Sequence, residues 1–490
     1  MPHDKTKLEQ ARAYEAREGA AIPASDRPRL HLTPWVGWMN DPNGFCYYRG
    51  AYHLFYQYHP YDTKWGPMHW GHAVTRDLLH WDYLPCALAP DTPADALGCF
   101  SGSAIELPDG RLELLYTGVS GTNESPVQAQ CVALGDGLDF EKLPHNPVIP
   151  SRQQPEGFCE ADFRDPRIWR EGDRYYCVAA GRHKENGGSI ELFESRDALH
   201  WEFVTVLDAS RDTLGAIWEC PDFFPLDGSQ VLVVSPQSIG PVEDPEIRPG
   251  YGTLALLGDY DAGTHRFERR SVQMLDHGME FYAPQTVLTP DGRRVMIAWM
   301  QNWETSNDAP RRHSWFGGMT LPRELFVRDG RLCQRPVREL ESLWQDEVLL
   351  RGLTVDGDAD LPRLAGRYLD LDLVLDAAQS PDCRALTLRF ACGGGLFTQV
   401  RWEADRGELV FDRSRCGTRR DIPHIRRIPA QPRNGKLTLR LILDGECAEL
   451  FVNDGERTIT ALLDTPLQAE GISLHSDGAA RVDIARHTLA

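Results

Sequence analysis

The sequence predicts an all-β protein, a five-bladed β-propeller followed by a C-terminal β-sandwich of the jelly-roll type. Two observations lead to this fold class. A unit of about 55 to 64 residues recurs five times in the first part of the chain, which suits a four-stranded propeller blade with its loops. After Leu343 the chain changes to short alternating strands with polar turns, as in a sandwich. The length of 490 residues exceeds one comfortable hydrophobic core, so we expect two domains.

Each repeat consists of an anchor, a short strand, a turn that contains Gly or Asp-Gly, and a more apolar strand. The five anchors are Asp41-Pro42, Ser101-Gly102, Asp165-Pro166, Cys220-Pro221 and Ala283-Pro284. Such turns between apolar runs are strong hairpin signals. The alternative is an ordinary β-sandwich in which hairpins recur by chance. The segments Thr75–Trp81 and Ser195–Trp201 argue against chance, because they are closely alike and keep the same order within their repeats.

The chain divides into three predicted parts. Residues 1–29 form an N-terminal extension, with a polar helix from about Lys7 to Arg17 that ends near Gly19. Residues 30–340 form the propeller and residues 350–490 the sandwich. The predicted sandwich strands are Tyr368–Leu375, Leu386–Phe390, Gln399–Trp402, Leu409–Phe411, Leu437–Leu443, Ala448–Val452 and Thr458–Leu463, with turns at Asp444-Gly445, Asp454-Gly455 and Asp477-Gly478. We expect the sandwich to cover and stabilise the propeller; a role in sugar binding is the alternative.

Composition excludes several classes of function. The formal net charge of −20 argues against nucleic acid as a partner. No run of 18 or more apolar residues predicts a membrane span, and the start has no apolar secretory signal. Twelve cysteines stand singly, without a Cys-x-x-Cys pair, so we expect reduced thiols and a cytoplasmic protein. A neutral sugar suits this charge, and a phosphorylated sugar needs only a local basic pocket. The sequence specifies no oligomeric state.

No metal and no organic cofactor is expected. His69, His72, His80 and His200 suggest a metal site at first sight, but their spacing fits no known ligand set. The last two of these histidines also lie in the two similar segments, which favours a structural role.

Three acids lie at the anchors of repeats one, three and four: Asp41, Asp165 and Glu219. The innermost strands of a propeller run side by side around its axis, so residues at matching points meet at one end of the central channel. Carboxyl groups paired at close range are what the hydrolysis of a glycosidic bond requires.

Each acid also has a simpler interpretation. The stretch Asn40–Asn43 is a common turn composition, and Asp165-Pro166 after Arg164 is compatible with a surface bend. Other acids lie close to the candidates, namely Glu160, Asp162 and Asp222.

Seven short motifs together resemble glycoside hydrolase family 32, the invertase and β-fructofuranosidase group. They are Trp38–Gly44, Trp65–His72, Phe100–Ser103, Phe163–Pro166, Glu219-Cys220, Phe281–Gln285 and Met319–Leu325. Any one of them is weak evidence, but all seven follow the order of the family from about residue 30 to 335. The C-terminal part resembles the sandwich of that family. One departure is Glu280, where relatives often carry Asp.

The resemblance implies a retaining mechanism. Asp41 is then the nucleophile that attacks the anomeric C2 of a fructosyl unit, and Glu219 is the acid and base. Such a pair lies about 5 to 5.5 Å apart, and its environments hold the two pKa values apart. The resemblance makes Asp165 the transition-state stabiliser that grips fructose hydroxyls, and Glu219 is preferred over its neighbours because the family places the acid directly before Cys-Pro.

The resemblance also implies a set of sugar-binding residues. They are Asn40, Gln57, Trp65, Phe100, Ser101, Arg164 and Tyr282. Polar members offer hydrogen bonds to hydroxyls, and aromatic members offer apolar faces to the C–H surface of the ring. For Gln57 and Ser101 the alternative is a structural role. Tyr282 and Trp303 are compatible with the lining of the channel and equally compatible with packing.

The predicted function is therefore that of a cytoplasmic β-fructofuranosidase that releases fructose from sucrose or sucrose 6-phosphate. Sucrose 6-phosphate is included beside sucrose because a cytoplasmic enzyme meets imported sugars, which are often phosphorylated. The alternatives are hydrolysis of short fructo-oligosaccharides, transfer of fructose to another sugar, and a propeller that binds sugar without catalysis.

Overall fold

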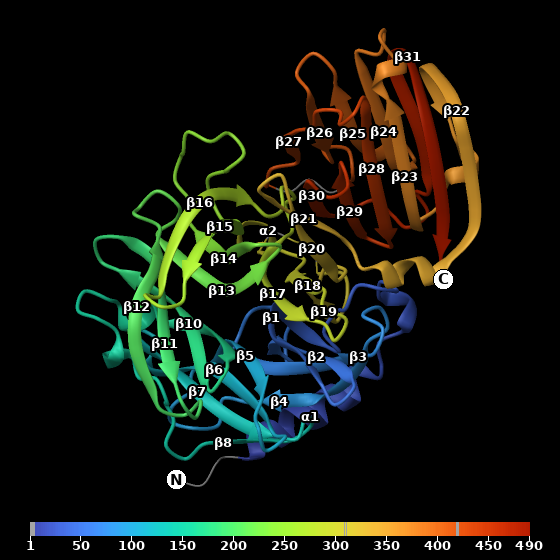
Figure 1. The fold of residues 1–490 in the computed structure, drawn as a ribbon. Coiled ribbons are helices and arrows are strands. Elements are labelled where there is room, and N and C mark those ends of the chain that lie inside the picture. Colours follow the sequence, from blue (N-terminus) through green and yellow to red (C-terminus); the bar gives the residue numbers. More distant parts are fainter. Residues whose placement is uncertain (1–4, 308, 310, 418–420) are drawn as a thin grey trace.

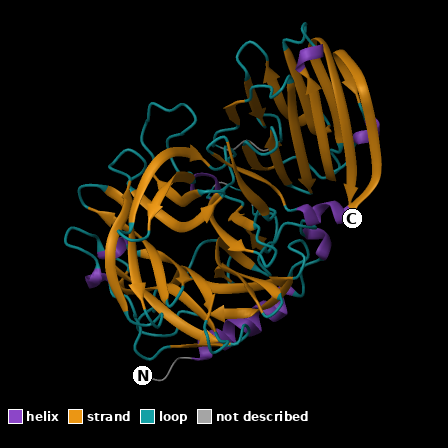
Figure 2. Cartoon of the chain, in the orientation of Figure 1, coloured by secondary structure: helices purple, strands orange, loops and turns teal. Residues whose placement is uncertain are grey.

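The computed structural model describes residues 5–307, 309, 311–417 and 421–490. A β-propeller in blue to yellow carries a β-sandwich in orange to red at one side (Figure 1). Strands dominate both parts, and the helices are few and short (Figure 2). The predicted fold class is confirmed. In the described part of the chain, no helix has both the length and the apolar composition needed to cross a membrane.

Five antiparallel sheets form the blades of the propeller. Their strands are, in blade order, β1 (Gly37–Tyr48), β2 (Ala51–His59), β3 (His69–Thr75) and β4 (Asp82–Leu88); β5 (Gly98–Glu106), β6 (Leu112–Thr122), β7 (Ser125–Gly135) and β8 (Phe140–Lys142); β9 (Arg164–Glu171), β10 (Arg174–His183), β11 (Gly187–Ser195) and β12 (Trp201–Ala209); β13 (Ile217–Leu226), β14 (Ser229–Gln237), β15 (Leu254–Asp261) and β16 (Arg266–Met274); β17 (Tyr282–Leu288), β18 (Arg294–Trp299), β20 (Arg323–Arg328) and β21 (Arg331–Pro336). The first strands contact one another in the order β1, β5, β9, β13, β17 and back to β1, which closes the ring.

A short strand from the last repeat also joins the first blade. β19 (Trp315–Phe316) pairs in parallel with β1, with Gly37 opposite Trp315 and Trp38 opposite Phe316. This pairing ties the end of the propeller to its beginning, so the ring does not depend on packing alone.

β-Bulges interrupt the innermost strands at the anchors. In β9, β13 and β17 the pairs Asp165-Pro166, Cys220-Pro221 and Ala283-Pro284 each lie opposite a single residue of the next strand. In β1 the bulge holds Asn40 and Asp41, and in β5 it holds Ser101. Proline has no N–H to give to the ladder, and a bulge leaves residues unpaired, so the repeated prolines fit this position. The anchors of the sequence repeat are therefore these bulges.

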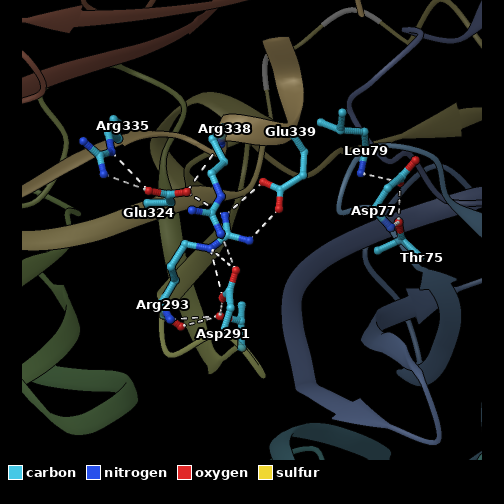
Figure 3. Close-up of polar contacts among 10 residues, drawn as sticks. Thr75, Asp77, Leu79, Asp291, Arg293, Glu324, Arg335, Arg338 and Glu339 are labelled. Carbon is cyan, nitrogen blue, oxygen red and sulfur yellow. Dashed lines mark hydrogen bonds and ion pairs between the residues drawn. The ribbon is translucent and has the colours of Figure 1, made fainter. Parts of the chain in front are cut away.

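The two similar segments fold into the same turn. Asp77 accepts hydrogen bonds from the Thr75 hydroxyl and from the Leu79 N–H, both at 3.0 Å (Figure 3). Asp197 accepts the equivalent bonds from the Ser195 hydroxyl at 3.1 Å and from the Leu199 N–H at 3.0 Å. The repeat therefore extends from the anchors to the outer turns of the blades.

The N-terminal helix packs on the first blade. α1 (Lys5–Gly19) contacts β4, which confirms the predicted helix. Arg12 Nε donates to the Cys86 carbonyl at 2.8 Å, and Glu15 accepts from the Cys86 N–H at 2.7 Å. The other helical segments are short: η1 (Ala24–Asp26), η2 (Ser151–Gln153), η3 (Glu160–Asp162), α2 (Trp303–Ser306), η4 (Arg338–Leu343), η5 (Pro362–Leu364) and η6 (Ala377–Gln379).

Ten strands form the C-terminal sandwich, and the hydrogen bonds link them into one folded sheet. They are β22 (Trp344–Asp360), β23 (Tyr368–Asp376), β24 (Ala385–Gly393), β25 (Leu396–Glu403), β26 (Glu408–Asp412), β27 (Ile425–Pro429), β28 (Lys436–Asp444), β29 (Cys447–Val452), β30 (Arg457–Leu462) and β31 (Gly471–Leu489). The long β31 pairs with β22, β23 and β24, and so joins the two layers around a core of leucine, isoleucine and valine side chains.

All seven predicted sandwich strands are confirmed, whereas β22, β27 and β31 were not predicted. One predicted turn was wrong: Asp477-Gly478 lies inside β31. Gly478 has a φ of +88°, and the pairing of β22 with β31 is irregular beside it, between Val355 and Gly357. A glycine with positive φ allows such a bulge within a strand, so the same dipeptide does not reverse the chain here.

Buried ion pairs join the two domains. Arg323 of the propeller contacts Glu449 of the sandwich at 2.6 Å and Asp276 at 3.0 Å, and all three side chains are fully buried. His31 lies between Asp444 and Glu449, at 2.8 and 3.0 Å. On the surface, Arg293 pairs with Glu339 of η4 and so holds the connection that leads to the sandwich (Figure 3).

Candidate active site

The first strands of four blades carry a connected group of polar side chains directly before the anchor Pro or Gly. Ser101 Oγ donates to Asp41 Oδ2 at 2.7 Å. The Cys220 N–H donates to Asp165 Oδ2 at 2.9 Å, and Cys220 Sγ lies 3.5 Å from both Asp41 Oδ2 and Asp165 Oδ2. Strands β1, β5, β9 and β13 therefore bring two of the three predicted acids together around one thiol.

A second group of side chains comes from the residues that stand directly before the anchor pairs of the third, fourth and fifth blades. Arg164 Nε lies 3.1 Å from Glu219 Oε1, and the Tyr282 hydroxyl donates to Glu219 Oε2 at 2.7 Å. Each oxygen of the Glu219 carboxylate thus has its own partner, from the blade before and the blade after. The carboxylate is held in one orientation, and 14% of its side chain remains exposed.

The three acids do not occupy equivalent positions, contrary to the sequence interpretation. Asp41 and Asp165 directly precede a proline, whereas Glu219 is separated from Pro221 by Cys220. Successive side chains of a strand point to opposite faces. The bulge at Cys220-Pro221 breaks this alternation, so Glu219 lies close enough for its charge to act on both aspartates.

The backbone at the site adopts conformations that residues other than glycine rarely take. Asp165, Cys220 and Ala283 have φ values of +62°, +49° and +51°. Such residues cost of order 1–3 kcal/mol each and gather at functional sites. The bulges thus aim the functional side chains at some cost in stability.

Electrostatics raises the pKa of both aspartates. Burial, followed by the charge of Glu219, raises the pKa of Asp41 to about 6. Hydrogen bonds from Ser101 and Asn40 act in the opposite direction. Burial raises the pKa of Asp165 to about 7; the charge of Arg164 lowers it, and those of Glu219 and Asp41 raise it. Carboxyl groups that share a site oppose one another's ionisation, so a proton is held here near neutral pH.

The remaining predicted residues lie around this network. Asn40 Nδ2 donates to Asp41 Oδ1 at 3.1 Å, and its own oxygen accepts from Trp38 Nε1 at 2.7 Å. Gln57 is buried and donates to the carbonyl of Cys99, so it supports the strand that carries Phe100. Trp65 is 50% exposed and meets Phe100 edge to face, with ring centroids 6.1 Å apart. An exposed aromatic ring next to Phe100 is suited to the C–H face of a sugar.

Two of the three competing acids, Asp162 and Asp222, are paired with arginine. Asp162 lies 3.0 Å from Arg164 and 2.6 Å from Arg182. Asp222 lies 3.0 Å from Arg167 and also accepts from the N–H and hydroxyl of Thr286, both at 2.8 Å. Asp162 thus binds two arginines and Asp222 is only 2% exposed, whereas Glu219 pairs with one arginine and with the Tyr282 hydroxyl.

Sequence reasoning missed some residues that belong to the site. Cys220 was read only as part of a motif, although its thiol lies between the two aspartates. Alignment of the repeats would have found it, because it stands at the position of Asp41 and Asp165. The Thr117 hydroxyl accepts from the Asp165 N–H at 2.9 Å, and no sequence signal marks this contact.

Comparisons with known proteins agree with the fold. Residues 31–336 match the Glycosyl hydrolases family 32 N-terminal domain, and residues 339–489 match the Glycosyl hydrolases family 32 C terminal. The chain is 39% identical to a sucrose-6-phosphate hydrolase of Zymomonas mobilis over 449 residues, 88% of this chain and 84% of that protein. It is 37% identical to a raffinose invertase of Escherichia coli over 455 residues, 92% of each chain.

A solved structure covers almost the whole chain. The family 32 β-fructofuranosidase of Bombyx mori, determined as a mutant in complex with sucrose, is 33% identical and has a TM-score of 0.85. The match covers 99% of this chain and 98% of that one. Because these matches extend over both domains, the chain belongs to glycosyl hydrolase family 32.

Proposed function

We propose that this glycoside hydrolase is a retaining β-fructofuranosidase that releases fructose from sucrose, sucrose 6-phosphate or both. Asp41 is the nucleophile, Glu219 the acid and base, and Asp165 the stabiliser of the transition state. The observation that carries this proposal is the convergence of the three acids, in which the charge of Glu219 acts on both aspartates and Glu219 is oriented through both of its oxygens. The names of the similar proteins support the substrate class.

In the first step, the Asp41 carboxylate attacks C2 of the fructosyl unit. The bond from C2 to the bridging oxygen breaks, and that oxygen takes a proton from Glu219 as it leaves with glucose. The products are a fructosyl ester of Asp41 and an ionised Glu219. In the second step, Glu219 takes a proton from water, whose oxygen attacks C2 and releases fructose and the Asp41 carboxylate.

The neighbouring residues prepare these steps. Asp41 attacks only when ionised, and the donors Ser101 and Asn40 each favour the ionised form at a different oxygen. Arg164 and Tyr282 orient Glu219 toward the leaving oxygen. Asp165, anchored by the Cys220 N–H, accepts hydrogen bonds from fructose hydroxyls.

We also propose a cytoplasmic location and a division of labour between the domains. Cys86, Cys99, Cys131 and Cys177 are buried free thiols, which suits a reducing compartment. Residues 30–340 form the catalytic domain, and residues 350–490 cover and stabilise it, with residues 1–29 as a helical extension. The buried ion pairs of Arg323 and His31 across the interface support this division.

The test is the initial rate of fructose release from sucrose and from sucrose 6-phosphate at low substrate concentration. Release from either substrate supports the proposal. No release from either one, with tight sugar binding in calorimetry, would contradict it in favour of a binding protein. Release only from longer fructosides would move the substrate class to fructo-oligosaccharides.

A further inference from the structure

The positive charge of Arg426 acts on Arg248 where the propeller faces the sandwich. Arg248 lies in the loop between β14 and β15, and Arg426 lies on β27, an edge strand of the sandwich on the propeller side (Figure 1). Within the described part of the chain, Arg248 Nη2 reaches only the Asp276 carbonyl, at a long 3.4 Å. Its Nε and Nη1 are buried and have no hydrogen-bond partner among the described residues. The same holds for Arg426 Nε and for Nε2 of the buried His277.

The acids nearby are already engaged with other arginines. Glu280 pairs with Arg413 at 2.8 Å. Glu246 pairs with both Arg331 at 2.9 Å and Arg457 at 2.6 Å. Asp276 pairs with Arg323. Each of these carboxylates therefore has its own cation, and none is committed to Arg248 or Arg426.

The exposed Glu304 is the other acid that acts on this region, and its charge is felt by Arg248 and by Arg426. The single carboxylate of Glu304 does not balance the positive charges of the two arginines. Burial, together with Arg426, lowers the pKa of Arg248 to about 9. The pKa of His277 is well below its usual range because of burial and the charges of Arg248, Arg457, Arg331 and Arg426.

A guanidinium with buried and unmatched N–H groups is costly, so this arrangement needs an anion. The chain as a whole is strongly acidic, with a formal net charge of −20. A cluster of unpaired arginines on such a chain is not a general property of its surface. Arginine offers a planar fork of donors that matches a phosphate group.

This cluster is connected to the residues that hold Glu219. Tyr251 follows Arg248 by three residues, and its ring packs 6.3 Å from the ring of Tyr282. Tyr282 holds Glu219, which protonates the leaving oxygen in the proposed mechanism. The segment from Asp276 to Glu280, on which Arg248 rests, runs directly into β17 and Tyr282. The arginines are therefore linked through Tyr251 and Tyr282 to the acid that serves the leaving group.

We propose that Arg248 and Arg426, with His277 beside them, bind the phosphate of a phosphorylated leaving group, so that sucrose 6-phosphate is the preferred substrate. This inference rests on the proposed function and narrows it. The phosphate dianion supplies the missing acceptors for the guanidinium groups. Its contacts are made by the part of the substrate that leaves, so glucose 6-phosphate binds to the same residues after the bond is broken.

The test compares kcat/KM for sucrose and for sucrose 6-phosphate in the wild type and in the variants Arg248→Gln and Arg426→Gln. A charged hydrogen bond of ordinary strength corresponds to about 10- to 100-fold in affinity, so each variant should lower the preference for the phosphate by about tenfold or more. Arg294→Gln is the matched control. Arg294 is also an arginine with a buried, unpartnered Nε, but it contacts the Phe224 ring of the propeller, and its replacement should leave the preference unchanged.

Product inhibition provides a second measurement that does not depend on variants. Glucose 6-phosphate should inhibit sucrose hydrolysis by the wild type at concentrations about tenfold or more below those of glucose. A wild type without preference for either sugar phosphate would overturn the inference while the proposed function stands. An unchanged preference in both arginine variants would overturn it as well. Failure to release fructose from either substrate would instead contradict the proposed function.

Discussion

Arg413 of the sandwich and Glu280 of the propeller form a fork of two parallel hydrogen bonds. Arg413 Nη1 lies 2.9 Å from Glu280 Oε2, and Nη2 lies 2.8 Å from Oε1. The side chains are 1% and 0% exposed. Glu280 also accepts from the Leu462 N–H at 3.1 Å. Because Glu280 precedes Tyr282 by two residues, this pair ties the second domain to the strand that orients Glu219.

Replacement of Arg413 by Ala should destabilise the protein by about 3–5 kcal/mol, because it leaves the buried carboxylate of Glu280 without a counter-charge. Denaturant unfolding measures this loss. The control is Arg328→Ala, which removes a pair with the exposed Asp454 and should cost about 0–1 kcal/mol. Equal losses in the two variants would contradict the assigned importance of the buried pair. Glu280→Asp, with a shorter reach, should fall between them.

Asp41→Asn should lower kcat by at least about 10⁴-fold, since an amide does not form the fructosyl ester. The fold and sucrose binding should remain, which thermal unfolding with and without sucrose can check. Asp173→Asn, an exposed acid in the turn between β9 and β10, serves as the control and should keep full activity. Normal turnover in Asp41→Asn would rule out the nucleophile assignment.

Glu219→Ala should slow substrates with poor leaving groups the most, because only those need a proton on the departing oxygen. The measurement compares kcat/KM for sucrose and for an aryl fructoside whose phenolate leaves readily. We expect the loss on sucrose to exceed the loss on the aryl substrate by about 100-fold or more. A similar loss on both substrates would argue against the acid role.

The acid limb of the pH profile should report Asp41. Its pKa is raised to about 6, chiefly by burial, so kcat/KM should fall as the pH drops below about 6 and the carboxylate is protonated. The Ser101 hydroxyl donates to Asp41 and favours the ionised form. Ser101→Ala should therefore shift the acid limb to higher pH. A limb that stays in place in this variant would show that another group controls it.

Much of the architecture was predictable because the signals for it are local. Proline and glycine at the anchors, and Asp-Gly at the turns, act on the backbone within a few residues. They marked five blades, and the structure confirms all five. The strands β22 and β31 escaped prediction because their stability depends on each other across the domain. β22 is mostly exposed and reads as a charged segment.

The sequence by itself determined the repeat and its anchors and singled out the three acids as candidates. Only the tertiary structure decided how those acids are held. The thiol of Cys220 between two aspartates, the fork of Arg413 on Glu280, and the unmatched charges of Arg248 and Arg426 each join residues far apart in the chain. Burial and electrostatic interaction depend on distance in space, and a linear pattern carries no record of that distance until the chain has folded.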